Sequence, residues 1–325
     1  MTRPLRIATR RSPLARAQAQ WVATELARIT GVEPVLVPVV TVGDTATGSL
    51  AVLGGTGVFV TAIRQALLDG DADLAVHSLK DLPTRDEPDL VMAAVPTRAD
   101  ARDALIGAGG LPDGFTKLPA AARVGTGSPR RAAQLRRLRP DVQVVDVRGN
   151  VATRLAMVES GVLDAVILAQ AGIDRLALDV VCTPFPIDDF VPAAGQGALA
   201  IEATVAAMAE PAFAAAIVQL DDHATRAAVT AERVLLAQLE AGCMAPVGAH
   251  AELLDQPAAQ PGDQSAAQPG AQLLELTSIV ISIDGTQEIR MSTTGPMSAP
   301  AQLGSQLASE LLSAGAATLL GESLL

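Results

Sequence analysis

Arginines are concentrated in one segment of the chain, at a density that would suit an anionic ligand. Eight of them lie between Arg123 and Arg154. Guanidinium groups pair bidentately with carboxylates and phosphates, which favours an anion-binding site. The cluster taken alone is equally consistent with a basic helix that faces solvent.

Several arginines flank three predicted helix N-termini. Ser12-Pro13, Ser128-Pro129 and Asn150 should each begin a helix, because Ser and Asn are good N-caps and Pro suits the first helical position. Exposed N–H groups at such ends favour anions. The arginines beside them are Arg10, Arg11, Arg130, Arg131, Arg148 and Arg154. Together they predict an anion-binding cleft between two domains, although any one end alone is consistent with ordinary capping.

Three other features could support chemistry. Lys80 and Asp81 follow the predicted strand Leu74–His77, the usual place for active residues in an open α/β sheet, although an exposed ion pair is the alternative. Cys243 lies in a predicted turn where its thiol could face a cleft; a small buried apolar group is the alternative. The glycine-rich segment 54–57 lacks the phosphate-loop ending and is interpreted as a loop beside the cleft.

The composition excludes several classes of protein. The length of 325 residues is enough for two or three domains. An aromatic content of 2%, no tyrosine and a pI near 4.7 argue against nucleic-acid binding. Two cysteines and three scattered histidines favour neither a disulfide framework nor a metal site, and they predict a reducing, cytoplasmic location. No apolar run approaches the length of a membrane span.

The net charge of −11 is unevenly distributed. Residues 1–175 carry 21 basic and 18 acidic side chains, whereas residues 176–325 carry 3 and 17. The early arginines, which precede any acid, resemble an organellar transit peptide, but strand and helix signals there favour mature fold. The first half is therefore suited to an acidic ligand despite the overall charge.

Short apolar strands alternate with helical patterns, which indicates an α/β fold. Ile7–Pro13 and Val124–Pro129 share an order of strand, Thr and Ser-Pro, and Gly70–Asp73 and Gly161–Asp164 each precede an apolar strand. This order predicts two domains of similar topology. Gly195–Gly197 predicts a hinge where the chain crosses back between them.

The chain after about residue 220 predicts a small α+β domain. It has a helical pattern at 231–239, strand patterns at 247–254, 273–283 and 288–292, and another helix at 301–312. Asp284-Gly285 is a hairpin signal. A repeated Ala-Ala-Gln-Pro-Gly within residues 255–272 predicts a mobile surface insert.

Six motifs, in order, resemble the porphobilinogen deaminase family, also called hydroxymethylbilane synthases. They are Arg6–Ala15, Ala75–Thr84, Val124–Arg131, Val147–Leu155, Pro192–Ala198 and Glu240–Gly248. Val52 and Thr56 depart from the family, which often has lysine at these positions.

The resemblance implies three domains. Residues 1–97 plus 197–219 would form a discontinuous α/β domain and residues 98–196 an arginine-rich one, both with mixed sheets similar to type II periplasmic binding proteins. Residues 220–325 would form an α+β domain that carries the cofactor cysteine.

The resemblance also implies a transferase of tetrapyrrole and heme biosynthesis. Four porphobilinogen molecules would be joined head to tail on a dipyrromethane primer, with release of ammonia, and hydrolysis would free hydroxymethylbilane. The enzyme would be a monomer without a metal, membrane or nucleic-acid partner, with a transient hand-off to uroporphyrinogen-III synthase. The alternative is a non-catalytic periplasmic-type binding protein for a small polyanion.

Site roles follow from the matching positions. Cys243 would hold the dipyrromethane through a thioether, and Asp81 would be catalytic, stabilising positive charge on pyrrole nitrogens and assisting proton transfer. The residues implied to hold cofactor carboxylates are Lys80, Ser128, Arg130, Arg131 and Arg154. Those implied to bind substrate are Arg10, Ser12, Thr126, Arg148, Arg175 and Gln196.

Overall fold

Two five-stranded mixed sheets share one strand order. The computed structural model describes residues 3–40, 57–107, 114–242, 245–254 and 272–322. The sheet orders are β2-β1-β3-β10-β4 and β7-β6-β8-β5-β9. In each, the first three strands are parallel and the fourth is antiparallel to the third. The predicted pair of α/β units with similar topology is confirmed.

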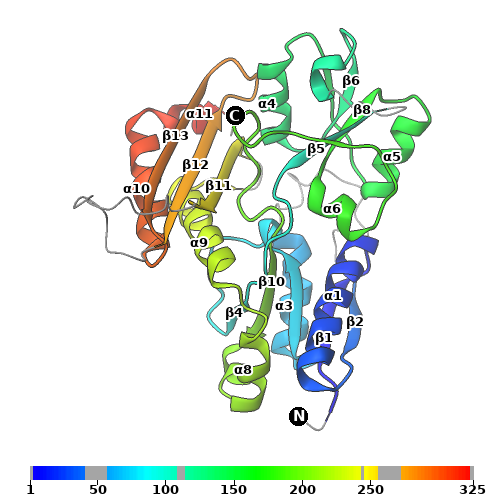
Figure 1. The fold of residues 1–325 in the computed structure, drawn as a ribbon, viewed down its shortest axis with the longest axis vertical. Helices are drawn as coiled ribbons and strands as arrows, with labels where there is room; N and C mark the ends of the chain where they lie inside the picture. The colour runs from blue at the N-terminus through cyan, green and yellow to red at the C-terminus, as the bar shows by residue number, and fades with distance from the viewer. Residues whose placement is uncertain (1–2, 41–56, 108–113, 243–244, 255–271, 323–325) are drawn as a thin grey trace, which may run out of the picture.

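The first sheet consists of β1 (Arg6–Arg10), β2 (Val35–Val39), β3 (Leu74–Ser78), β4 (Leu90–Ala94) and β10 (Leu199–Thr204). The second consists of β5 (Asp103–Gly107), β6 (Arg123–Gly125), β7 (Gln143–Val145), β8 (Ala165–Ala169) and β9 (Thr183–Pro184). Each sheet with its helices is called an α/β unit below, and Figure 1 shows the first unit below the second.

Helices cover both sheets. Those of the first unit are α1 (Pro13–Thr30), α3 (Gly57–Leu68), α7 (Val205–Met208) and α8 (Pro211–Val218). Those of the second unit are α4 (Pro129–Leu138), α5 (Val151–Glu159) and α6 (Gln170–Arg175), with a 3-10 turn, η2, at Gly114–Lys117. Helix α1 buries one stripe, which includes Val22 and Leu26, against the first sheet.

The chain crosses between the units twice, and the two crossings lie side by side. The amide of Ala99 donates to the carbonyl oxygen of Gly197 at 3.1 Å. Gly197 has a φ of +87°, and a Cβ there would lie 2.5 Å from the Ala99 oxygen. Only glycine fits this close approach. The predicted return of the chain at Gly195–Gly197 is confirmed.

A third, antiparallel sheet packs against helices near the C-terminus. It contains β11 (Val247–Leu253), β12 (Leu273–Ile281) and β13 (Glu288–Pro296). Its helices are α9 (His223–Gln238), α10 (Pro300–Ser313) and α11 (Ala316–Glu322). The predicted hairpin at Asp284-Gly285 joins β12 to β13. Of the predicted insert at 255–272, residues 255–271 lie outside the described residues.

Helix α9 begins at His223, well before the predicted start at residue 231. Asp222 caps it by accepting from the amide of Thr225 at 2.7 Å. The hydroxyl of Thr225 accepts in turn from the amide of Arg98 in the first crossing. The extra turns therefore pack on the first unit, and Figure 1 shows α9 reaching from that unit to the third sheet.

The hairpin of the third sheet contacts helix α4 of the second unit. Arg136 donates to the carbonyl oxygen of Ile283 at 2.7 Å, and Arg137 forms an ion pair with Glu288. A Cβ at Gly285 would lie 2.6 Å from the carbonyl oxygen of Ala133.

In the described part of the chain, no helix is long and apolar enough to cross a membrane.

Candidate active site

The Lys80–Asp81 pair lies on a short 3-10 turn, η1 (Leu79–Asp81), directly after β3. The amide of Leu79 donates to the carbonyl oxygen of Ala198 at 3.0 Å, and the amide of Leu82 closes the turn onto Leu79. The buried Leu79 side chain anchors the turn, while Lys80 contacts Gln196 and Asp81 lines a cavity. The predicted position at the end of a strand is confirmed.

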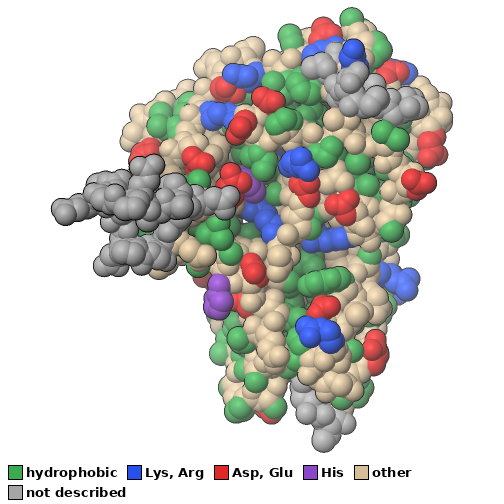
Figure 2. Space-filling model, in the orientation of Figure 1, with side chains coloured by type: hydrophobic (Ala, Val, Ile, Leu, Met, Phe, Trp, Pro, Cys, Tyr) green, Lys and Arg blue, Asp and Glu red, His purple; other side chains and the backbone are tan. Residues whose placement is uncertain are grey.

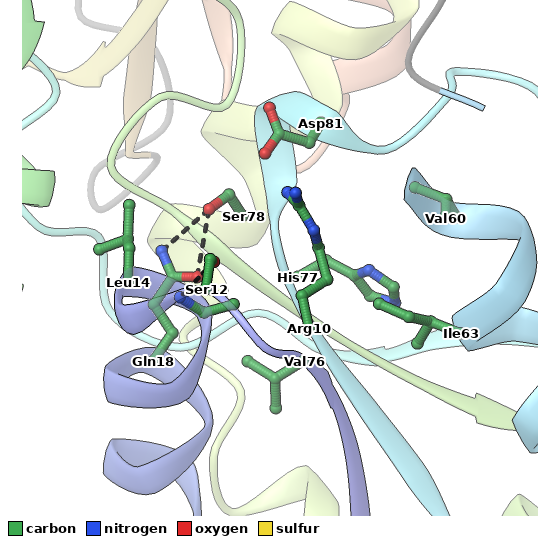
Figure 3. A pocket seen from close by; sticks show the side chains of 11 residues that line it. Arg10, Ser12, Leu14, Gln18, Val60, Ile63, Val76, His77, Ser78 and Asp81 are labelled. Atoms are coloured by element: carbon green, nitrogen blue, oxygen red, sulfur yellow. Dashed lines mark hydrogen bonds between the residues drawn. The ribbon is translucent and has the colours of Figure 1, made fainter. Parts of the chain in front are cut away.

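Asp81 and the start of α1 line one small cavity. Its volume is about 60 Å³, and its polar lining includes Arg10, Ser12, Gln18 and Asp81. Gln18 donates to the Ser78 hydroxyl at 2.9 Å, which ties α1 to the end of β3. In Figure 3 the Arg10 guanidinium points toward the Asp81 carboxylate. Two residues predicted to bind substrate therefore lie beside the predicted catalytic residue.

A buried ion cluster lies beneath this cavity. Glu202 of β10 lies 2.8 Å from Arg64 of α3 and 3.2 Å from Nε2 of His77. Burial alone would raise the pKa of Glu202, but the nearby His77 ring and the hydrogen bonds from Arg64 outweigh burial and lower that pKa to about 2. His77, a lining residue, is thereby held by an acid that sequence analysis missed.

The centre of the site is a buried carboxylate between two arginines. Asp103, at the start of β5, is fully buried and lies 2.8 Å from Arg130 and 2.7 Å from Arg131. Both arginines are more than nine-tenths buried. Burial would raise the pKa of Asp103, yet the two guanidinium charges hold it well below its usual range. Sequence analysis missed Asp103, although an acid beginning an apolar five-residue strand was an available signal.

Gln196 connects the two units at this point. Its Oε1 accepts from Lys80 Nζ at 3.0 Å, and its Nε2 donates to Asp103 at 2.9 Å and to the carbonyl oxygen of Ala101 at 2.8 Å. Burial and the charge of Arg131 lower the pKa of Lys80 to about 8. A lysine of the first unit thus shares one network with the arginines of the second.

The predicted caps of the second unit are confirmed. Ser128 Oγ accepts from the amide of Arg131 at 3.4 Å at the start of α4, and Asn150 Oδ1 accepts from the amide of Thr153 at 2.9 Å at the start of α5. Buried Thr126 accepts from the amide of Ser128 at 3.2 Å, which shapes the turn before α4.

Of the remaining predicted arginines, Arg154 and Arg175 lie near this centre, whereas Arg148 is exposed. Arg154 donates to the carbonyl oxygen of Gly149 at 3.0 Å, and burial and the charge of Arg131 lower its pKa. Arg175 donates to the carbonyl oxygen of Gly197 at 2.7 Å. Arg148 is exposed, 3.7 Å from Asp146. Figure 2 shows Lys and Arg side chains at the waist between the two units.

Burial is the largest cause that lowers the pKa of the cations in this site, and repulsion between them adds to it. The charge of Arg131 lowers the pKa of both Lys80 and Arg154, because each cation makes a neighbouring positive charge less favourable. A bound polycarboxylate would relieve this repulsion.

The predicted attachment residue Cys243, and the departures Val52 and Thr56, lie outside the described residues.

Comparisons with known proteins cover nearly the whole chain. A family model described as "Porphobilinogen deaminase, dipyromethane cofactor binding domain" matches residues 5–209. A second, "Porphobilinogen deaminase, C-terminal domain", matches residues 226–313.

Two curated proteins illustrate the similarity. The chain is 47% identical over 327 residues to porphobilinogen deaminase 1 of Streptomyces coelicolor, covering 98% of each. It is 46% identical over 330 residues to porphobilinogen deaminase of Thermobifida fusca, covering 99% of this chain and 97% of that one. Among solved structures, the periplasmic aliphatic sulphonate binding protein SsuA of Escherichia coli is 16% identical with a TM-score of 0.35, over 74% of this chain and 71% of that one.

Proposed function

The chain belongs to the porphobilinogen deaminase family, and from that premise we propose which of its residues carry the reaction. The protein is a transferase that joins four porphobilinogen molecules head to tail, releases ammonia at each step, and finally frees hydroxymethylbilane by hydrolysis. The dipyrromethane cofactor, when bound, supplies the nucleophilic pyrrole carbon that begins the chain. We propose Cys243 as its attachment point, within a domain of residues 220–325.

The cations around Gln196 suit the carboxylates of this cofactor. We propose that Lys80, Ser128, Arg130, Arg131 and Arg154 hold them. The lowered pKa values of Lys80 and Arg154 support this role, because a carboxylate would offset the charge of Arg131. Arg130 and Arg131 already pair with Asp103. They would therefore attract the cofactor carboxylates through their positive charge and through the N–H groups that Asp103 does not occupy.

The substrate also carries carboxylates, and we propose a second set of residues for it. The set is Arg10, Ser12, Thr126, Arg148, Arg175 and Gln196. Arg10 and Ser12 border the cavity beside Asp81, which supports a substrate position there. Thr126 and Gln196 are both buried, and Gln196 contacts both units. We assign these units to residues 1–97 plus 197–219 and residues 98–196.

Asp81 is proposed as the catalytic residue. Loss of ammonia leaves an electron-poor pyrrole, and formation of the new C–C bond places positive charge on pyrrole nitrogens. A carboxylate fixed on a short turn can accept hydrogen bonds from these pyrrole N–H groups and stabilise their positive charge. By taking the proton of a pyrrole N–H and giving it to the leaving amine, the same carboxylate can also assist the release of ammonia. The Arg10 guanidinium beside it supports a position for a substrate carboxylate at the same cavity.

The presence of the cofactor tests the function directly. Intact mass of the purified protein should exceed the mass of the unmodified chain by one dipyrromethane, and Cys243→Ser should remove both the added mass and the release of ammonia from porphobilinogen. Cys182→Ser is the matched control, because Cys182 is a partly buried residue that packs against the core of the second unit and is not the proposed attachment residue. An unmodified wild-type chain that binds polyanions without turnover would favour the non-catalytic binding protein.

Loss of a substrate arginine should interrupt elongation. We expect Arg148→Ala to lower kcat/KM, because one charge-assisted contact contributes about 1.5–3 kcal/mol, which corresponds to roughly 10- to 150-fold. Chains stopped before completion should appear as extra porphobilinogen units in the intact mass. Arg123→Ala removes an exposed arginine of the same unit, paired with Asp164, and serves as control. Wild-type kinetics in Arg148→Ala would contradict its assignment.

Location and assembly are further proposals. We propose a cytoplasmic monomer that hands its product transiently to uroporphyrinogen-III synthase. The low cysteine content supports a reducing compartment. Light scattering of the purified enzyme tests the monomer, and product transfer in a coupled assay with a trapping enzyme tests the hand-off.

A further inference from the structure

Two neighbouring residues of α9, Glu232 and Arg233, connect this helix to opposite sides of the Lys80–Asp81 turn. Glu232 contacts the segment that packs under the start of the turn. Arg233 contacts the segment that follows its end. Helix α9 ends at Gln238, so the helix that contacts the turn precedes the proposed attachment residue, Cys243, by a few residues in the sequence.

Glu232 acts through the second crossing. It is fully buried, accepts from the amide of Gly195 at 2.6 Å and pairs with Arg98 at 2.6 Å. Gly195 lies directly against the turn, because a Cβ there would fall 2.2 Å from Leu79 Cδ2 and 3.3 Å from the Lys80 nitrogen. The start of the turn is therefore held by packing and by the Leu79 amide.

Arg233 holds the other end. Its guanidinium donates to the carbonyl oxygen of Pro83 at 2.8 Å and to that of Leu82 at 3.3 Å. Burial lowers its pKa, and the charges of Asp86 and Glu202 partly offset this effect. Among the described residues, no acid forms a salt bridge with Arg233. Its hydrogen bonds there go to the main-chain carbonyl groups that immediately follow Asp81.

We propose that Arg233 is a positioning residue for Asp81. By fixing the carbonyl groups of Leu82 and Pro83 it sets the direction in which the turn presents the Asp81 carboxylate. Without it, the hydrogen bond of the Leu82 amide to Leu79 is left to hold the end of the turn. A displacement of a catalytic group by about 1 Å can lower the rate by roughly 100-fold. This inference rests on the proposed catalytic role of Asp81.

A matched control exists on the same helix. Arg226 also donates to main-chain carbonyl groups, those of Met92 and Ala93, and it pairs with Asp221. Its contacts hold β4, away from the Lys80–Asp81 turn. Arg226→Gln should therefore lower the melting temperature while keeping the wild-type kcat and KM.

The test compares Arg233→Gln, Arg233→Lys and Arg226→Gln in the cofactor-loaded enzyme. Arg233→Gln should lower kcat by roughly 10- to 100-fold with an unchanged KM for porphobilinogen and an unchanged intact-mass adduct. Arg233→Lys should recover only part of the lost kcat and stay measurably below wild type, because an ammonium group can replace one of the two carbonyl contacts but not both.

Three outcomes would overturn the proposal. These are a wild-type kcat in Arg233→Gln, an equal loss of kcat in Arg226→Gln, or a loss confined to KM. If Arg233→Gln does not fold, Arg233→Lys decides: a lowered kcat at wild-type KM supports the proposal, and a wild-type kcat contradicts it. A wild-type enzyme that releases no ammonia from porphobilinogen would instead overturn the proposed function.

Discussion

Asp81→Asn should lower kcat for porphobilinogen by about 10²- to 10⁴-fold, the range of a positioned acid–base group, while the chain keeps its covalent adduct. Asparagine has the same shape and can occupy the same place on the turn. Its neutral amide cannot stabilise positive charge on pyrrole nitrogens, nor can it transfer the proton to the leaving amine. The proposed binding residues are untouched, so KM should change much less than kcat.

Ammonia release and intact mass measure this effect together. Asp69→Asn, an exposed substitution at the end of α3, is the matched control and should keep wild-type values for both. A kcat for Asp81→Asn close to that of the control would remove Asp81 from the chemistry. Loss of the adduct would instead assign Asp81 to cofactor assembly.

Local signals in the sequence predicted the elements that carry the site. Ser12, Ser128 and Asn150 each cap a helix, because capping depends on residues only three positions apart. The position of Lys80 and Asp81 followed from a single apolar strand. The equivalent strand orders of the two sheets followed from a repeated order of short signals.

Interactions between distant residues could not be predicted in this way. Asp103 meets Arg131 across 28 positions and Gln196 across 93, and Glu232 meets Arg98 across 134. No local pattern encodes such pairs. The early start of α9 has both origins: Asp222 caps it through a residue three positions away, and the contact of Thr225 with Arg98 in the first crossing holds the same turn from a distance.

The arginine cluster shows how the two kinds of information combine. Sequence analysis interpreted Arg130 and Arg131 as ligands for an anion, and the structure shows that the protein already provides them with one. A carboxylate ligand would therefore enter a site in which Asp103 neutralises part of the charge, leaving Lys80 and Arg154 less compensated. Asp103 makes the burial of two adjacent guanidinium groups possible before any cofactor is attached.

Asp103→Asn should consequently cost about 3–5 kcal/mol of unfolding free energy, the range for removing one partner of a buried ion pair. Urea unfolding of the cofactor-free chain measures it. Asp164→Asn, which breaks the more exposed Arg123 pair, should cost about 1 kcal/mol or less.

The pH dependence provides an independent check on Asp103. The pKa of Asp103 is lowered in the folded protein, so its stabilisation is complete well above the unfolded pKa of about 3.9 and declines as pH falls toward the folded value. The difference in unfolding free energy between wild type and Asp103→Asn should therefore be constant near neutral pH and shrink below about pH 4. A difference that stays constant into strong acid would show that the substitution acts through packing and not through the charge between Arg130 and Arg131.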